Sequence, residues 1–349
     1  MPRSGEKRRR DGTTITTFQE TPPMSTYLLA FAIGEFVSLE MRTQRNLPLS
    51  VWTHPEDFHS ARFPANFSPT MFDRLEDELE VPYPLPKMDF IAARSFPVGG
   101  MENWGLIVFD KQSLLLDSAL EDSLNMTVDR LYHEYRIEKI VTHEITHQWF
   151  GNLVTMRDWS DLWLNEGFAT YMTYDMLQRD HPKLTENEYL TRLCQLVRKQ
   201  STLDRPALVR PLTTEMEVEQ SFHGTHLYSK GSVLINMIRD LVSDFEFRAG
   251  VRSRNYQNGM ITVKQRQCDD HNHKVFLKDD KEYLVEEQDL GVALIGMNAI
   301  HRLFDSFRGV DLPELHLYLA PVIAQLDKLL DDSQTDTELA ALWLIDPTR

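Results

Sequence analysis

Hydrophobic residues recur at helical spacing in two consecutive stretches near the middle of the chain. In residues 128–151, Ile137, Val141 and Ile145 follow one another at intervals of four, which is the spacing of one helix face. Residues 162–176 form a largely apolar stretch that is typical of a second helix, with Leu162, Glu166, Ala169 and Met172 on neighbouring turns. The pattern predicts two helices that pack against each other.

Alternating and β-branched runs predict strands before these helices, at residues 14–18, 27–36, 49–53, 88–93 and 106–109. A helix is predicted around residues 69–80, followed by three prolines that end it. Residues 1–12 are polar and are predicted to be disordered. Further helices are predicted downstream, at residues 187–199, 232–242, 293–307 and 312–330.

His143 and His147 are four residues apart in the first predicted central helix. Residues at this spacing lie on the same helix face, so both imidazoles can reach one ion. Glu144 lies between them, close enough in sequence to accept a proton from a water molecule on that ion. Since zinc can lower the pKa of a bound water toward ~7, the pattern indicates a hydrolytic metal site.

A site with two histidines needs a third protein ligand and an open fourth position. Glu166, in the second central helix, is the candidate, and residues 151–161 give the chain room to turn between the helices. The alternative is a chance HExxH match on a solvated surface helix. That alternative would also have to explain the apolar second helix and the tryptophans around it.

Two other features are ambiguous when taken alone. Residues 97–105 form a glycine-rich turn, where Gly99 and Gly100 permit close approach of a ligand. An ordinary hairpin bend is the favoured interpretation of that turn by itself. Tyr228 precedes a predicted helix, and without further context it is best interpreted as a core aromatic residue.

Composition narrows the class of partner. The 349 residues are 42% hydrophobic, enough for one large or two modest cores. The net charge of −16 argues against nucleic acid or an anionic membrane as the main partner, and it suits a site that takes a cationic group. No run approaches the ~20 apolar residues of a membrane span. Cys194 and Cys268 lack the spacing of a thiolate metal site.

Four segments together resemble one family, the gluzincin zinc aminopeptidases, which include aminopeptidase N-like, glutamyl and puromycin-sensitive enzymes. The segments are HEITHQWFGNLVTM from His143, WSDLWLNEGFATY from Trp159, GGMENWG from Gly99 and LYSKG from Leu227. The resemblance implies an α+β, thermolysin-like catalytic domain with one Zn²⁺ per chain, and we expect a mixed sheet in it with an edge strand near residues 106–109. It also implies hydrolysis of the N-terminal residue from peptide substrates that have a free N-terminus.

The resemblance assigns roles residue by residue. The zinc ligands would be His143, His147 and Glu166. Glu144 would be the general base, and Tyr228 would stabilise the oxyanion. The substrate main chain would be held by Gly99, Gly100, Met101, Glu102 and Asn103, with Glu102 binding the free α-ammonium.

The expected organisation has three parts. Residues 1–38 would hold a tail and the last strands of a preceding β domain, residues 39–250 the catalytic domain, and residues 251–349 a mostly helical region. The alternatives are an epoxide hydrolase like leukotriene A4 hydrolase and a non-catalytic peptide-binding homologue. The compartment stays open, because the family has membrane-anchored, secreted and cytosolic members.

Overall fold

The computed structural model describes residues 1–117, 128–156, 159–186, 212, 214–222, 226–241 and 244–252, and the strand residues 261–263, 275–276 and 282–283. Within these residues, no helix combines the length and the apolar character needed to cross a bilayer. The predicted helices at 187–199, 293–307 and 312–330 lie outside the described residues, as do Cys194 and Cys268.

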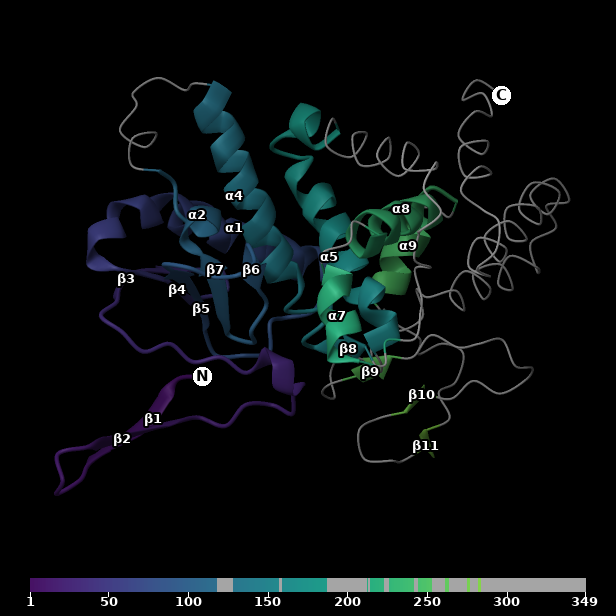
Figure 1. The fold of residues 1–349 in the computed structure, drawn as a ribbon. Coiled ribbons are helices and arrows are strands. Elements are labelled where there is room, and N and C mark those ends of the chain that lie inside the picture. Colours follow the sequence, from purple (N-terminus) through teal and green to yellow (C-terminus); the bar gives the residue numbers. More distant parts are fainter. Residues whose placement is uncertain are drawn as a thin grey trace, which may run out of the picture.

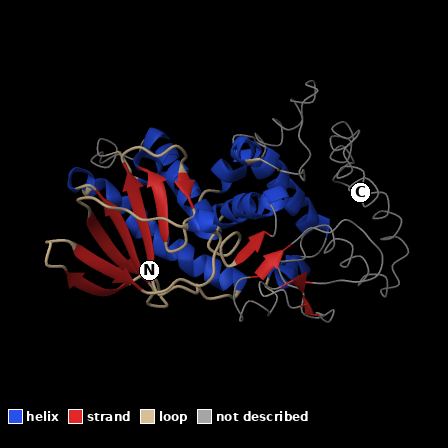
Figure 2. Ribbon diagram, turned by 60° about the horizontal axis from the view of Figure 1, so that its bottom comes forward, coloured by secondary structure: helices blue, strands red, loops and turns tan. Residues whose placement is uncertain are grey.

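A five-stranded mixed sheet forms the first half of the structure (Figures 1 and 2). Its spatial order is β3 (Val37–Arg42), β4 (Pro48–Thr53), β5 (Met88–Ala93), β7 (Leu106–Asp110) and β6 (Gly100–Met101). The three inner strands are parallel, and β3 and β6 run antiparallel at the two edges. Alternate residues of β4 are buried, as expected for a strand with one face on the core. The predicted α+β class is confirmed.

The predicted strand 106–109 is present, but its expected place at the sheet edge is wrong. Gly100 and Met101 pair with Phe109 and Val108, so the glycine-rich turn itself contributes the edge strand β6. A two-residue strand carries no periodicity of its own, and only its pairing with β7 defines it. The turn therefore places its backbone along an open sheet edge.

The predicted strand 27–36 is wrong. The chain forms a 3₁₀ turn at Thr26–Leu28 and enters the sheet only at Val37. Phe31 and Ile33 are 80% and 89% exposed. Their alternation resembles a strand, but a strand also needs a partner, and the described residues provide none here.

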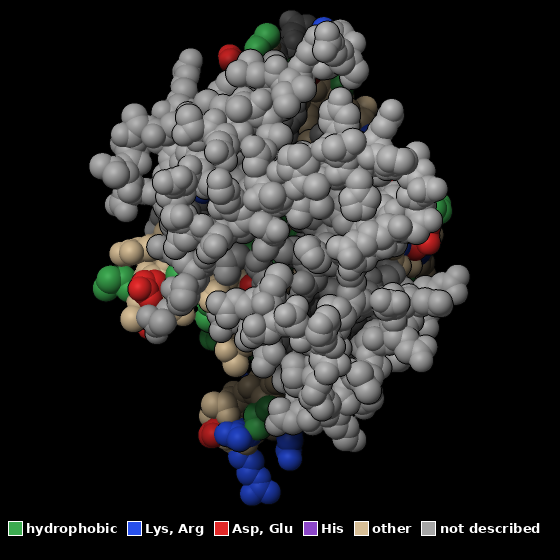
Figure 3. All heavy atoms as spheres, turned by 90° about the vertical axis from the view of Figure 1, so that its right-hand side faces the viewer, with side chains coloured by type: hydrophobic (Ala, Val, Ile, Leu, Met, Phe, Trp, Pro, Cys, Tyr) green, Lys and Arg blue, Asp and Glu red, His purple; other side chains and the backbone are tan. Residues whose placement is uncertain are grey.

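The predicted disorder of residues 1–12 is also wrong. β1 (Arg3–Arg8) pairs antiparallel with β2 (Thr14–Phe18), and Asp11 accepts a hydrogen bond from the backbone of Thr13 in the connecting turn. The hairpin projects from the molecule in Figure 1, and Lys and Arg side chains gather at this lower end in Figure 3. Pairing with β2 orders a segment whose composition alone indicates disorder.

Helices pack beside the sheet and carry the site. α1 (Arg62–Leu79) begins earlier than predicted, with Pro69 inside it. The two central helices are confirmed as α4 (Val128–Thr146) and α5 (Leu162–Leu177). The other described helices are α2 (Lys111–Leu114), α7 (Glu215–Phe222), the π-helical turn η6 (His226–Lys230), α8 (Gly231–Leu241) and α9 (Asp244–Val251), besides short 3₁₀ turns. The other described strands are short: β8 (Val154–Met156), β9 (Ile261–Val263), β10 (Val275–Phe276) and β11 (Glu282–Tyr283).

An aromatic cluster joins α1, the sheet and the end of α4. The Phe72 ring on α1 lies 6.0 Å from that of Trp149 and 6.4 Å from that of Phe90 on β5, measured between ring centroids. Trp149 Nε1 donates to the carbonyl oxygen of Val81 at 3.0 Å. Because Trp149 follows His147 by two residues, this buried cluster holds the end of the histidine helix against the sheet.

Candidate active site

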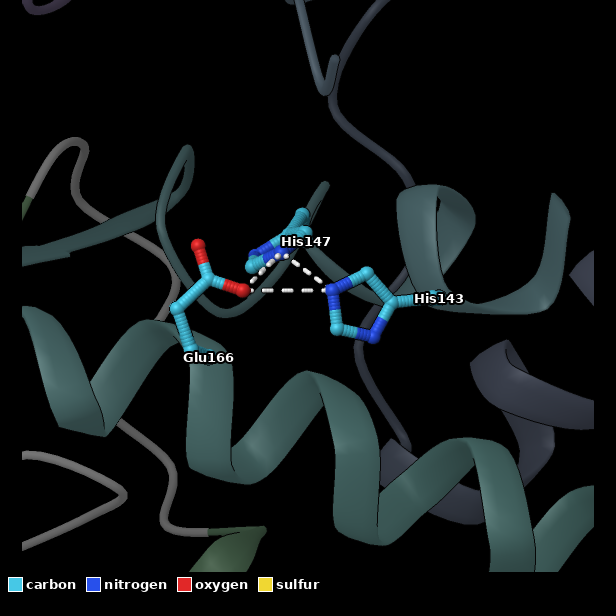
Figure 4. A group of neighbouring side chains, drawn as sticks. All are labelled: His143, His147 and Glu166. Carbon is cyan, nitrogen blue, oxygen red and sulfur yellow. Dashed lines mark hydrogen bonds and ion pairs between the residues drawn. The ribbon is translucent and has the colours of Figure 1, made fainter. Parts of the chain in front are cut away.

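Three side chains from α4, the turn after it and α5 converge on one point (Figure 4). His143 Nε2 lies 3.2 Å from Glu166 Oε2, and His147 Nε2 lies 3.4 Å from the same oxygen. The two Nε2 atoms are 3.1 Å apart. His147 and Glu166 are buried, and the described residues thus contain two imidazoles and a carboxylate that could hold a metal ion.

The spacing of these three atoms suits a small tetrahedral cation. Zinc binds histidine nitrogen and carboxylate oxygen at about 2.0–2.1 Å, so neighbouring ligand atoms in a tetrahedron are separated by about 3.3–3.4 Å. The three observed separations, 3.1, 3.2 and 3.4 Å, lie close to this value. The residues present therefore fit such an ion, and the triangle leaves the fourth position open.

A backbone carbonyl fixes the orientation of His147. Its Nδ1–H donates to the carbonyl oxygen of Phe150 at 2.9 Å, which leaves Nε2 to face Glu166 and to serve as the ligand atom for a metal ion. This carbonyl is available because α4 ends at Thr146 and the chain turns back, with Gly151 at a φ of +128°. Outer hydrogen bonds of this kind hold the tautomer that a metal ligand needs.

Two further carboxylates lie beside the triangle. Ligand atoms of Glu102, Glu144 and His147 all lie within 4.8 Å of one another, and all three residues are buried. Gly100 on β6 packs directly on Glu144, since a Cβ at position 100 would lie 2.6 Å from Glu144 Oε1. The edge strand and the histidine helix are therefore in contact at the site.

Burial and close approach shift the pKa values of the acids and of His147 in this site. Burial raises the pKa of Glu102, and it raises the pKa of Glu144 well above its usual range. Burial opposes ionisation of Glu166 as well, but the neighbouring histidines outweigh it and lower its pKa to about 2. Burial would lower the pKa of His147, yet the charges of Glu166 and Glu102 raise it to about 10. A dication and an ammonium group bound beside these acids would favour their ionised forms.

Tyr228, on η6, lies beside His143. Its ring centroid lies 6.0 Å from that of His143. Burial and the charges of the three acids raise its pKa, so its hydroxyl keeps its proton and remains a donor. Close contact of two glycines brings η6 here: a Cβ on Gly231 would lie 2.9 Å from the Cα of Gly167 on α5.

The rest of the glycine-rich turn is held by the protein itself. The carbonyl oxygen of Gly99 accepts from the backbone N–H of Asp110 at 3.2 Å. Asn103 Nδ2 donates to the carbonyl oxygen of Leu28 at 3.3 Å, and Met101 lies in β6. Sequence reasoning missed two buried amides, Gln148 and Asn152, which donate to the carbonyl oxygen of Glu102. Their polar character in an apolar stretch was the available signal.

Two imidazoles and an acid on packed helices, with a spare carboxylate next to them, are the arrangement that metallohydrolases of the HExxH class use. The Peptidase family M1 domain matches residues 63–279, which is more than half of the chain. The chain belongs to peptidase family M1, and the resemblance to the zinc aminopeptidases is confirmed.

Curated relatives cover the same region. Glutamyl aminopeptidase of Sus scrofa is 37% identical over 254 residues, which are 72% of this chain and 26% of the relative. Endoplasmic reticulum aminopeptidase 1 of Mus musculus is 37% identical over 238 residues, 67% of this chain and 24% of the relative. Aminopeptidase A of Gloydius brevicauda is 31% identical over 339 residues, 95% of this chain and 32% of the relative. The chain spans about a quarter to a third of the length of these relatives.

Proposed function

We propose that the protein is a zinc-dependent aminopeptidase that hydrolyses the N-terminal residue from peptides with a free N-terminus. The observation that carries this proposal is the position of Glu102. Its buried carboxylate lies in one cluster with Glu144 and His147. This cluster adjoins the three side chains His143, His147 and Glu166, which we call the metal-ligand triangle. A buried acid there forms a charge-assisted hydrogen bond with an α-ammonium, which an internal segment of a peptide cannot offer.

The metal site would be held by His143, His147 and Glu166. A zinc ion bound there supplies Lewis acidity, which polarises the scissile carbonyl and acidifies water. Glu144 accepts the proton of the attacking water and delivers it to the leaving amine, and its raised pKa suits it to both transfers. The contact with Gly100 holds the Glu144 carboxylate against the edge strand.

Tyr228 and the edge strand would complete the site. The Tyr228 hydroxyl donates to the oxygen that gains negative charge as the tetrahedral intermediate forms, a contribution of ~3 kcal/mol for one well-placed donor. Among the described strands β6 pairs with β7 alone, so the Gly100–Met101 part of the Gly99–Asn103 turn can offer its other edge to an extended peptide. Glu102 then binds the α-ammonium at the end of that edge.

The division of the chain into residues 1–38, 39–250 and 251–349 is part of the same proposal. It is supported by the place of the described site, whose residues all fall between Gly99 and Tyr228. Residues 251–349 would form a packing region that contributes no catalytic residue.

Paired substrates test the function. The full chain, loaded with zinc and assayed for metal content, should bind one zinc and release chromophore from aminoacyl anilides. The N-acetylated anilides should react far more slowly, and Glu102→Gln should remove most of this difference by slowing the free-amine substrate. Equal rates on acetylated and free-amine anilides in the unaltered chain would overturn the role of Glu102. Zinc binding without any hydrolysis would instead favour a peptide-binding protein.

A further inference from the structure

Two amide side chains hold one backbone carbonyl group beside the site. Gln148 Nε2 donates to the carbonyl oxygen of Glu102 at 3.1 Å, and Asn152 Nδ2 donates to the same oxygen at 2.8 Å. Gln148 Nε2 also lies 3.2 Å from the carbonyl oxygen of Glu144. Gln148 and Asn152 are both 0% exposed. Side-chain amides thus connect the substrate-facing turn to the histidine helix.

The two amides stand on a rigid part of the chain. The backbone N–H of Asn152 donates to the carbonyl oxygen of His147 at 3.1 Å, and that of Leu153 donates to the carbonyl oxygen of Gln148 at 3.2 Å. Tyr83 Oη donates to Gln148 Oε1 at 3.4 Å. The amides therefore lie in the same hydrogen-bonded turn as His147, the proposed metal ligand. Their hydrogen bonds fix the position of the Glu102 backbone relative to His147.

The Glu102 carbonyl oxygen depends on these side-chain donors because Glu102 lies outside the hydrogen-bonded ladder of the sheet. β6 ends at Met101, so Glu102 is the first residue beyond the ladder with β7. Its side chain is buried with ligand atoms within 4.8 Å of those of Glu144, and two carboxylates this close push one another apart when both are ionised. A backbone anchor at Glu102 keeps its carboxylate in place against that repulsion.

We propose that Gln148 and Asn152 are positioning residues for recognition of the substrate's α-ammonium, acting through Glu102. The inference rests on the proposed aminopeptidase function. The two amides contact the protein backbone and determine how far the Glu102 carboxylate lies from Glu144. They thereby set where the first substrate residue stops relative to the water that Glu144 deprotonates.

Asn152→Leu and Gln148→Met test this with little change in volume. Asn152 Oδ1 has no hydrogen-bond partner among the described residues. Leucine at this position therefore removes the Nδ2 donor without depriving another described group of its acceptor. Thr173→Val is the matched control, because it removes a buried hydroxyl hydrogen bond on α5 that does not involve Glu102. Each variant is prepared as the full zinc-loaded chain. Asn152→Ser, which shortens the side chain and keeps it small and polar, replaces Asn152→Leu if that variant does not fold.

Both amide variants should keep one zinc per chain and raise KM for free-amine anilides about tenfold or more, with kcat changed less than threefold. Thr173→Val should change neither constant. The inhibition constant of an amino alcohol with a free amine should rise by the same factor as KM, and that of its N-acetyl form should not. An amide variant with unchanged KM and unchanged inhibition constants would overturn the proposal.

A double-mutant cycle separates positioning from general damage. Adding Asn152→Leu to Glu102→Ala should raise KM no further, because the group that Asn152 positions is already gone. An equal further rise in that background would show that Asn152 acts elsewhere, and the proposal would be wrong. Lack of hydrolysis by the unaltered zinc-loaded chain is a different result, since it refutes the proposed function itself.

Discussion

The contact between Gly231 and Gly167 determines how closely η6, and with it Tyr228, approaches the metal-ligand triangle. A Cβ at position 231 would lie 2.9 Å from the Cα of Gly167 and 3.3 Å from the carbonyl oxygen of Trp163. These are backbone atoms, so they cannot rotate away as a side chain would. Ordinary van der Waals contact begins near 3.4 Å, so Gly231→Ala requires α8 to move about 0.5 Å away from α5.

Two effects of Gly231→Ala follow from that displacement. Overpacking of a well-filled contact costs about 1–3 kcal/mol of unfolding free energy. Tyr228 lies three residues before position 231 and moves with it. A misplacement of 1 Å can cost about 10²-fold in rate, so half of that shift should lower kcat roughly tenfold.

The assay compares Gly231→Ala with Gly250→Ala. A Cβ on Gly250, in α9, would meet nothing within 4 Å, so that variant should keep its kcat and its stability or gain up to about 1 kcal/mol from helix propensity. Urea unfolding midpoints and kcat on an aminoacyl anilide are measured on zinc-loaded chains. If Gly231→Ala matches Gly250→Ala in both quantities, the glycine contact does not position Tyr228. In a Tyr228→Phe background, Gly231→Ala should lower stability as before and lower kcat little further.

Three further predictions concern the site. Glu144→Gln should keep its zinc and lower kcat by about 10²–10⁴, because the general base is lost while the metal ligands remain. Full turnover by this variant would show that Glu144 is not the base. Tyr228→Phe should lower kcat by about 10²–10³ with KM little changed, and an unchanged kcat would argue against a role as oxyanion donor. Glu166→Ala should abolish stoichiometric zinc binding as measured by elemental analysis, and chelation of the unaltered chain should stop hydrolysis until zinc is restored. Retention of one tightly bound zinc by Glu166→Ala would show that the ligand set is different.

The close approach of His143, His147 and Glu166 could be predicted because it depends mostly on local geometry. His143 and His147 share a helix face by spacing alone, and the apolar pattern of α5 brings Glu166 toward them. The edge of the sheet could not be predicted in this way. β6 exists only as the partner of β7, and the exposed segment around Phe31 has alternation without a partner. Strand pairing depends on segments that meet in space, which periodicity does not report.

The sequence by itself determined the metal-binding pattern and the helices that carry it, because these depend on local spacing. It also determined the likeness to one enzyme family, because each of the four segments carries its motif in a short run of residues. Only the tertiary structure decided that Glu102 faces Glu144, that Gln148 and Asn152 hold the Glu102 carbonyl, and that two glycines admit Tyr228. Those contacts join residues far apart in the chain, and the Asn152–Glu102 bond spans 50 positions. Their existence depends on how the sheet edge, the turn after α4 and α8 pack together, and local spacing carries no record of that packing.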